Sequence, residues 1–172
     1  VGHIVYASSC AVYGDSIVVN KEDEATIPIS HYGASKVACE ALISAYCNTY
    51  SMRGTAFRFS NIIGSRAKNG VIPSFIDKAL HNDGFIQMDD DGDQTRSFLK
   101  VEDCGDCLAT MGLEEPDKVY EVYNVSSLDN IKIAEVAEII REVSGLDFGL
   151  ECGPVRIGDI RHSRLSTHKL RK

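Results

Sequence analysis

The sequence has no long hydrophobic run, since no stretch approaches the roughly 18 uninterrupted apolar residues that a membrane-spanning helix requires. It also has no excess of positive charge, because 25 acidic residues against 18 lysines and arginines give a net charge of −7. An acidic chain is poorly suited to non-specific binding of nucleic acids or anionic membranes. No secretory signal opens the chain. We therefore expect a cytoplasmic protein with neither a nucleic-acid nor a membrane partner.

The ligand spacing of a zinc site is also missing. Cys104 and Cys107 form one C-x-x-C pair, but no second pair and no H-x-x-x-H accompanies it. The six cysteines are scattered, so we interpret them as reduced thiols. The acidic run 89–93 resembles a calcium loop only superficially, because the first and last ligand positions would fall on Gln87 and Phe98. We expect a solvated turn there, and no metal in the protein.

No G-x-G-x-x-G turn, the usual cradle for the pyrophosphate of a dinucleotide, follows a predicted strand. Strands are predicted over 1–7, 55–59, 85–88 and 120–125, and helices over 32–50, 74–81, 101–114 and 131–144, with a tail over 154–172 that forms a loop and then a short helix. Gly54 is expected to end the first of these helices and Gly145 the last. This alternation is typical of an α/β fold with a parallel sheet.

The motif Tyr32-Gly-Ala-Ser-Lys36 opens the first predicted helix. Residues four apart share one face of a helix, so the phenol and the ammonium project together. A phenol is a poor base at neutral pH, and a nearby positive charge favours its phenolate form. Tyr32 would then exchange a proton with a substrate hydroxyl while hydride leaves the same carbon. Alone, the pair is a weak signal, because such pairs also occur by chance on solvated helix faces.

The strand that precedes Tyr32 and Lys36 strengthens the catalytic interpretation, because this strand ends in Ala7-Ser8-Ser9-Cys10. Hydroxyls at the carboxyl end of a parallel strand face the crevice in which ligands bind. Ser9 would hydrogen-bond the reacting hydroxyl and pass its proton to Tyr32. We predict Ser9, Tyr32 and Lys36 as the catalytic group.

Further motifs extend this pattern along the chain. They are Ser8-Ser9-Cys-Ala-Val-Tyr-Gly14, Ser30-His-Tyr32-Gly-Ala-Ser-Lys36, Arg58-Phe-Ser-Asn61-Ile-Ile-Gly64, Gly92-Asp-Gln-Thr-Arg96-Ser-Phe98 with Val101-Glu-Asp103, and Arg156-Ile-Gly-Asp159-Ile-Arg-His-Ser163. Their order resembles the extended short-chain dehydrogenase/reductase superfamily, in its NAD-dependent epimerase/dehydratase branch, and most of all the UDP-glucose and UDP-N-acetylglucosamine 4-epimerases. The match covers only the later part of that family's usual length. We therefore expect a C-terminal portion, with the glycine turn of the dinucleotide site outside it.

The resemblance implies an α/β fold that contains the later strands of a partial Rossmann-like parallel sheet and a small C-terminal substrate-binding subdomain. Residues 1–66 would belong to the dinucleotide-binding domain and carry the catalytic residues. Residues 67–172 would form mainly the substrate-binding subdomain, and a strand near 120–125 could return to the sheet. The intact protein would be a homodimer that associates through the helix starting at Tyr32. NAD is the expected cofactor, and NADP stays open because the residue that reads the ribose 2′-position would lie outside this chain.

The resemblance also implies roles for individual residues. Ser9, Tyr32 and Lys36 match the catalytic positions. The cofactor positions are Ser8, Ser9, Tyr32, Lys36 and Ser60, and the substrate positions are Asn61, Val71, Arg96, Arg156, Asp159 and Ser163. The forked guanidinium groups of Arg96 and Arg156 suit phosphate oxygens, and Asp159 can accept hydrogen bonds from ribose hydroxyls. The competing interpretation is that either arginine only pairs with a surface carboxylate.

The expected reaction is NAD-dependent epimerisation at C4 of a UDP-hexose or UDP-N-acetylhexosamine through a 4-keto intermediate. The 4,6-dehydratases of this branch place an Asp-Glu pair where this chain has Cys10-Ala11, and its decarboxylases usually carry a glutamate in place of Ala11. Both therefore lack their acid/base residue here. A 3,5-epimerase that uses Cys10, an oxidoreductase and a non-catalytic fragment or binding module stay open as alternatives. In the resemblance, Ser163 matches a wall position of the sugar pocket where a large side chain would exclude an N-acetyl group, so the small serine is expected to leave room for one.

Overall fold

The computed structural model of the protein describes residues 2–81, 84–114 and 116–172. Its strands are β1 (His3–Ser9), β2 (Arg53–Phe59), β3 (Asn61–Ile63), β4 (Phe85–Met88), β5 (Thr95–Arg96), β6 (Phe98–Lys100), β7 (Tyr120–Val125), β8 (Ile131–Lys132) and β9 (Gly149–Cys152). Its helices are the 3-10 helix η1 (Cys10–Val12) and the α-helices α1 (His31–Tyr50), α2 (Val71–His81), α3 (Val101–Met111) and α4 (Ile133–Ser144). None of the helices in these described segments has the length and apolar character needed to traverse a bilayer.

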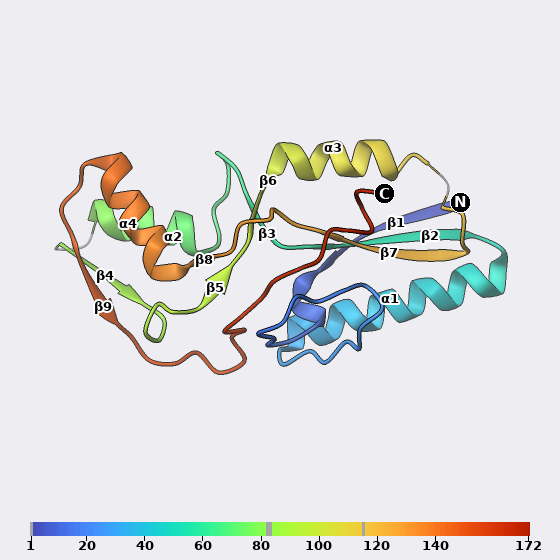
Figure 1. Ribbon diagram of the computed structural model, residues 1–172, viewed down its shortest axis with the longest axis horizontal. Coiled ribbons are helices and arrows are strands. Elements are labelled where there is room, and N and C mark those ends of the chain that lie inside the picture. The colour runs from blue at the N-terminus through green and yellow to red at the C-terminus, as the bar shows by residue number, and fades with distance from the viewer. Residues whose placement is uncertain (1, 82–83, 115) are drawn as a thin grey trace.

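One group of elements is built on a parallel sheet with the strand order β1-β2-β7. Helices α1 and α3 lie on opposite faces of this sheet (Figure 1). On β2, the side chains of Phe57 and Phe59 pack with α3, whereas the intervening Arg58 reaches Glu40 of α1. This alternation is what a strand covered on both faces requires. The parallel sheet between helices confirms the α/β class that the sequence predicts.

Helix α1 begins one residue before its predicted start, because Ser30 caps it. The Ser30 Oγ accepts a hydrogen bond from the Gly33 backbone N at 3.0 Å. The helix ends where Ser51 takes a left-handed conformation with φ 54°. Gly54 instead lies inside β2, where an added Cβ would come within 2.7 Å of the Cys47 Sγ. The prediction that Gly54 ends the helix is therefore wrong, and its lack of a side chain lets α1 approach the sheet.

A second group of elements packs α2 and α4 against the parallel pair β4–β9 (Figure 1). Its core consists of Phe75, Ile86, Met88, Ile133, Val136, Ala137 and Phe148. Helix α4 ends as predicted at Gly145, which has φ 68° and donates its N–H to the Arg141 carbonyl. Strand β7, from the later part of the chain, pairs in parallel with β2. The division of the chain into 1–66 and 67–172 stays a prediction.

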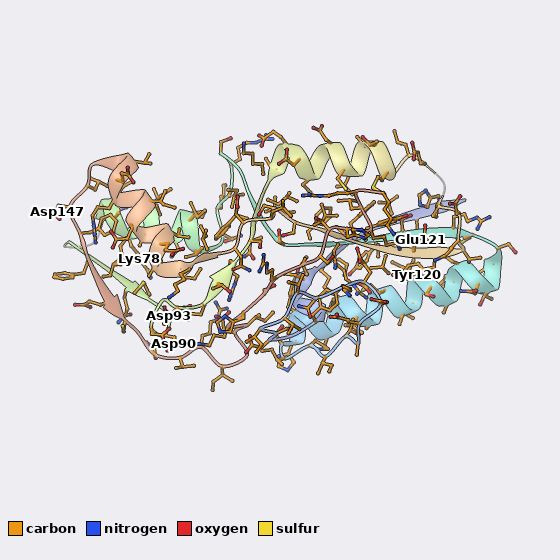
Figure 2. The ribbon with its side chains drawn as sticks, in the orientation of Figure 1. Lys78, Asp90, Asp93, Tyr120, Glu121 and Asp147 are labelled. Carbon is orange, nitrogen blue, oxygen red and sulfur yellow. The ribbon has the colours of Figure 1, made fainter. Side chains whose placement is uncertain are left out.

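The C-terminal tail is held by distant segments. Residues 154–172, all of them described, contain turns and single β-bridges but no helix, so the predicted short helix is wrong. The backbone of Asn20 accepts a hydrogen bond from Ser166 N at 2.9 Å and donates one to the Arg164 carbonyl at 2.9 Å. Arg161 forms ion pairs with Asp90, labelled in Figure 2, and with Asp91. The acidic run 89–93 is therefore an attachment point for the tail as well as a turn.

Candidate active site

The predicted catalytic residues meet at the carboxyl end of β1. Ser9 ends β1, Tyr32 lies in the first turn of α1, Lys36 follows one turn later, and all three line a first cavity of about 660 Å³. The Ser9 Oγ accepts a hydrogen bond from the Ala11 backbone N at 3.2 Å, which caps η1. Tyr32 is 56% exposed. Its phenol is therefore open to a ligand in this cavity.

The ammonium group of Lys36 is held between the strand end and two aromatic rings. Its Nζ donates a hydrogen bond to the Ala7 carbonyl at 2.8 Å. The same nitrogen lies 5.5 Å from the centroid of the Tyr32 ring and 5.0 Å from that of Tyr6, which are cation–π distances. Burial, followed by interaction with the Cys39 thiol, raises the pKa of Tyr6. Tyr6 therefore stays protonated, and Tyr32 is the phenol that lines the cavity.

Two of the predicted substrate residues that line the same cavity pair with each other. Arg96 Nη2 donates to both carboxylate oxygens of Asp159, at 3.0 and 3.1 Å. Arg96 Nη1 also donates to the Thr95 carbonyl at 2.9 Å. The sequence left open that Arg96 only pairs with a carboxylate, and Arg96 does form such a pair, with Asp159. That carboxylate lines the same cavity, however, so the pair forms part of the site.

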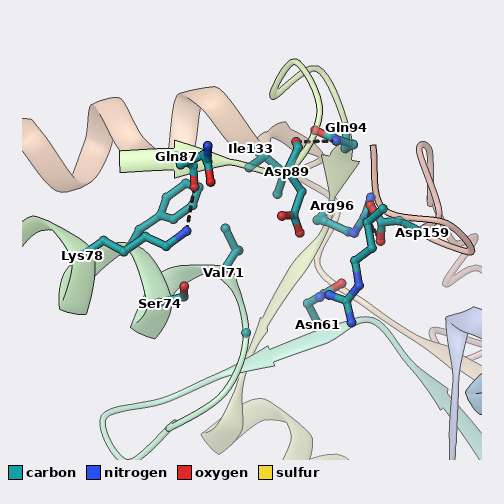
Figure 3. A pocket seen from close by; sticks show the side chains of 13 residues that line it. Asn61, Val71, Ser74, Lys78, Gln87, Asp89, Gln94, Arg96, Ile133 and Asp159 are labelled. Carbon is teal, nitrogen blue, oxygen red and sulfur yellow. Dashed lines mark hydrogen bonds and ion pairs between the residues drawn. The ribbon is translucent and has the colours of Figure 1, made fainter. Parts of the chain in front are cut away.

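A second cavity of about 410 Å³ adjoins the first and shares Asn61, Arg96, Arg156 and Asp159 with it. Figure 3 shows this cavity between α2, the end of β4 and the side chain of Arg96. Lys78 stands on its far wall, where its Nζ donates to the Gln87 carbonyl at 2.6 Å. The shared residues place two guanidinium groups where the two cavities meet.

The structure brings all the predicted site residues to these two cavities. The first is lined by Ser8, Ser9, Tyr32, Lys36, Ser60, Asn61, Arg96, Arg156, Asp159 and Ser163, and the second adds Val71. The Ser8 hydroxyl donates its hydrogen to Glu40, so it is directed at a protein partner. The Ser60 Oγ, in contrast, is buried and has no hydrogen-bond partner among the described residues. The roles of these residues stay predictions.

A buried charged network beneath the first cavity was missed by the sequence analysis. Glu40 is 6% exposed and accepts hydrogen bonds from Arg58 Nη2 at 2.7 Å and Nε at 3.0 Å. Arg58 Nη1 donates to the Tyr13 hydroxyl at 2.8 Å, and that hydroxyl donates to Asn124 Oδ1 at 2.8 Å. Burial is the largest single influence on Arg58 and opposes its charge, but the interactions with Glu40 and Tyr13 together outweigh it and raise the pKa of Arg58. The sequence offers one indication of Glu40, which stands four residues after Lys36 and so lies on the same face of the predicted helix.

The Cys104–Cys107 pair shows no sign of metal binding. Burial, with a smaller effect of Cys104, raises the pKa of the Cys107 thiol to about 11. Zinc binds the thiolate, so this environment disfavours the form that a metal needs. Over the described ranges, no three His, Cys, Asp or Glu side chains gather closely enough to hold a metal ion.

Known proteins resemble this chain in both sequence and structure. The sequence model of the "NAD dependent epimerase/dehydratase family" matches residues 1–126. A UDP-glucose 4-epimerase of Corynebacterium glutamicum is 27% identical over 175 residues, which cover 92% of this chain and 53% of that protein. A UDP-N-acetyl-alpha-D-glucosaminuronate decarboxylase of Bacillus cytotoxicus is 34% identical over 154 residues, 82% of this chain and 46% of that protein.

A solved structure described as "MoeE5 in complex with UDP-glucuronic acid and NAD" has a TM-score of 0.91 and 28% identity, and the match covers 98% of this chain and 57% of that one. The chain spans about half the length of the curated relatives it matches. The similarity confirms the Rossmann-like fold class, and the family model covers well over half of the chain. This chain therefore belongs to the NAD dependent epimerase/dehydratase family.

Proposed function

We propose that this chain carries the catalytic residues of an NAD-dependent enzyme that inverts C4 of a UDP-hexose or UDP-N-acetylhexosamine. The observation that supports this most directly is that Ser9, Tyr32 and Lys36 line the same cavity as the Arg96–Asp159 pair. The cavity thus combines groups that can move a proton with groups that can bind phosphate and ribose. Since the chain spans about half of its curated relatives, the activity is proposed for the whole protein.

The proton would move between the sugar and the phenol of Tyr32. Ser9 would hydrogen-bond the C4 hydroxyl, the phenolate form of Tyr32 would take its proton, and the resulting neutral phenol would return it after the keto sugar has turned over. The Lys36 ammonium, 5.5 Å from the Tyr32 ring centroid, would stabilise the phenolate that accepts this proton. NAD, when bound, supplies a reversible hydride acceptor for C4. Because hydride returns to the sugar, no cofactor is consumed.

The residues around Tyr32 fit a nicotinamide cofactor. The Ser60 Oγ is buried beside the cavity, and none of the described residues partners it. A buried hydroxyl without a partner is unfavourable, and the carboxamide of nicotinamide could satisfy it. Lys36 and Tyr32 present further polar groups to a ribose on the same side.

The two adjoining cavities suggest the path of the substrate. A sugar in the first cavity and a nucleoside in the second would place the diphosphate between them, beside Arg96 and Arg156. Guanidinium groups bind phosphate oxygens through paired hydrogen bonds, so this junction suits a diphosphate. Such a ligand would compete with Asp159 for the Arg96 donors, which now bond both oxygens of that carboxylate.

A 3,5-epimerase is the second candidate, because Cys10 is among the residues that line the same cavity. That reaction moves carbon-bound protons, and a thiol could take part in it.

Decarboxylation and dehydration are less well supported. Ala11 lines the cavity at the position where these relatives would need a carboxylate. The assay below distinguishes the proposed epimerase from two further alternatives. These are an oxidoreductase, which would consume cofactor, and a non-catalytic protein.

The activity is best tested on the whole protein, purified with NAD and given UDP-glucose or UDP-N-acetylglucosamine. Proton NMR of the anomeric and H4 signals should show conversion to the C4 epimer, while absorbance at 340 nm shows no net build-up of NADH. Stoichiometric consumption of cofactor would indicate an oxidoreductase instead. Absence of turnover with every UDP-sugar tried would contradict the proposal.

Substitution of Ser163 tests the choice of sugar. Ser163 is buried against the first cavity, and its carbonyl accepts a hydrogen bond from Asn130 Nδ2 at 2.7 Å. We expect Ser163→Tyr to fill the space for an N-acetyl group and to lower kcat/KM for UDP-N-acetylglucosamine by roughly 10–100-fold, while sparing UDP-glucose. Ser163→Ala is the matched control and should leave both values close to the wild type. Equal losses on both substrates would refute this role.

Association of the intact protein through α1 is also proposed. The side chains of Leu42, Tyr46 and Tyr50 are 59%, 54% and 65% exposed along this helix. Tyr46 and Tyr50 stack with ring centroids 5.5 Å apart. An exposed apolar stripe of this kind is suited to a helix of a second copy. Sedimentation of the whole protein should give the mass of a dimer, and a monomer at micromolar concentration would contradict this.

A further inference from the structure

Helix α1 directs three functional groups at the same strand end. Tyr32, Lys36 and Glu40 follow one another at intervals of four residues, so they share one face of the helix. The first two line the first cavity. The third lies below it, almost fully buried, and accepts the hydrogen of the Ser8 hydroxyl.

The Glu40 carboxylate joins three elements of the fold. Ser8 of β1 and Arg58 of β2 stand beside each other in the sheet, and both donate hydrogen bonds to it. Arg58 is 5% exposed, so this ion pair is shielded from water. Hydrogen bonds to a charged acceptor in such surroundings are stronger than neutral ones and more strictly oriented.

The network continues to the third strand and to the turn after Ser9. The Tyr13 hydroxyl, just beyond η1, accepts a hydrogen bond from Arg58 and donates one to Asn124 of β7. Both sides of Ser9 are thereby fixed, at Ser8 by Glu40 and at Tyr13 by Arg58. Both serines line the first cavity, but the Ser8 hydroxyl donates its hydrogen to Glu40 of α1, whereas the Ser9 Oγ accepts a hydrogen bond from the Ala11 backbone N.

We propose that Glu40 is a positioning residue that, held by Arg58, ties Ser8 to α1 and so keeps Ser9 opposite Tyr32 and Lys36. Ser8 serves in this tie and is not a ligand of the cofactor. The inference rests on the proposed function, because it concerns the geometry of the same proton transfer. Small displacements of reacting groups lower turnover steeply, which gives the tie a measurable effect.

The test is Ser8→Ala in the whole NAD-loaded protein, a change that removes one hydroxyl and leaves the Glu40–Arg58 pair in place. We expect kcat to fall by about tenfold or more, with KM and the Kd of NAD unchanged. Ser8→Thr, which keeps the hydroxyl and suits a strand, should recover most of the loss. Ser8→Cys, of similar size but a weaker donor, should fall between them.

Other outcomes would overturn the inference. A weaker Kd for NAD with little change in kcat would make Ser8 a cofactor ligand. A lower thermal midpoint with unchanged kcat would make the contact merely structural. If the wild type turns over and Ser8→Ala has the same kcat, only the inference about Glu40 and Ser8 is overturned. If the wild type does not turn over, the proposed function is overturned and this inference with it.

Discussion

Replacing Tyr32 with phenylalanine should lower kcat for C4 epimerisation by about 10²–10⁴-fold, the range over which a lost acid/base group reduces turnover. The substitution removes only the phenolic oxygen. The ring that lies 5.5 Å from Lys36 Nζ remains, and so does the bond from Lys36 to the Ala7 carbonyl. Because Tyr32 is more than half exposed, we expect little change in thermal stability. KM should stay close to the wild-type value, since the substitution leaves unchanged the hydrogen bond proposed between the sugar hydroxyl and Ser9.

The measurement is steady-state turnover of the UDP-sugar by the whole protein, with the Kd of NAD determined alongside. Tyr123→Phe is a matched control, because it also removes one phenolic oxygen. That oxygen donates a hydrogen bond to Glu121 at 2.9 Å, and Tyr123 lines neither of the two cavities. Its kcat should be unchanged. If Tyr32→Phe retained wild-type turnover, the proton would have to be carried by another group of the first cavity, and the role proposed for Tyr32 would be refuted.

Elements with strong local signals could be predicted from the sequence. The helix over 32–50 differs by one residue from α1, because an N-cap serine and the apolar spacing act within the segment itself. The strand over 120–125 coincides with β7. The predicted strand over 1–7 falls on β1, although residue 1 lies outside the described residues. In each of these segments, the local sequence is enough to indicate the secondary structure.

The shorter strands could not be predicted in this way. Strands β3, β5, β6, β8 and β9 are two to four residues long. Each exists because of a partner far along the chain, as when Thr95–Arg96 pairs with Ile131–Lys132. The helix predicted in the tail fails for the same reason, because the hydrogen bonds of the tail go to Asn20 and other distant backbone groups. Pairing of this kind leaves little trace in local composition.

For the candidate site, the resemblance to a known family indicates individual residues without specifying their partners. It indicated Arg96 and Asp159 but not that they bond each other across 63 positions. It passed over Glu40 and Arg58, because a charged residue in a sequence is assumed to be exposed. Only the structure shows that these two charges are buried together under the cavity.

Replacement of Arg58 by leucine should destabilise the protein by about 3–5 kcal/mol, because it leaves the buried Glu40 carboxylate without its positive partner. Natural domains are stable by only about 5–15 kcal/mol, so this is a large share of the total. Three hydrogen bonds to Glu40 are lost as well as the one to Tyr13. The measurement is the free energy of unfolding in urea, with the thermal midpoint as a second reading.

The double variant Glu40→Leu/Arg58→Leu separates the unpaired charge from lost packing. Replacing both members of a buried pair by apolar residues is often neutral or stabilising, so the double variant should be more stable than Arg58→Leu alone. Lys132→Ala is the control for an exposed pair, because Lys132 and Asp93 are both about half exposed, and it should change stability far less. Equal instability of the single and double variants would show that Arg58 stabilises the sheet by packing. The charge of Glu40 would then not be what makes its partner necessary.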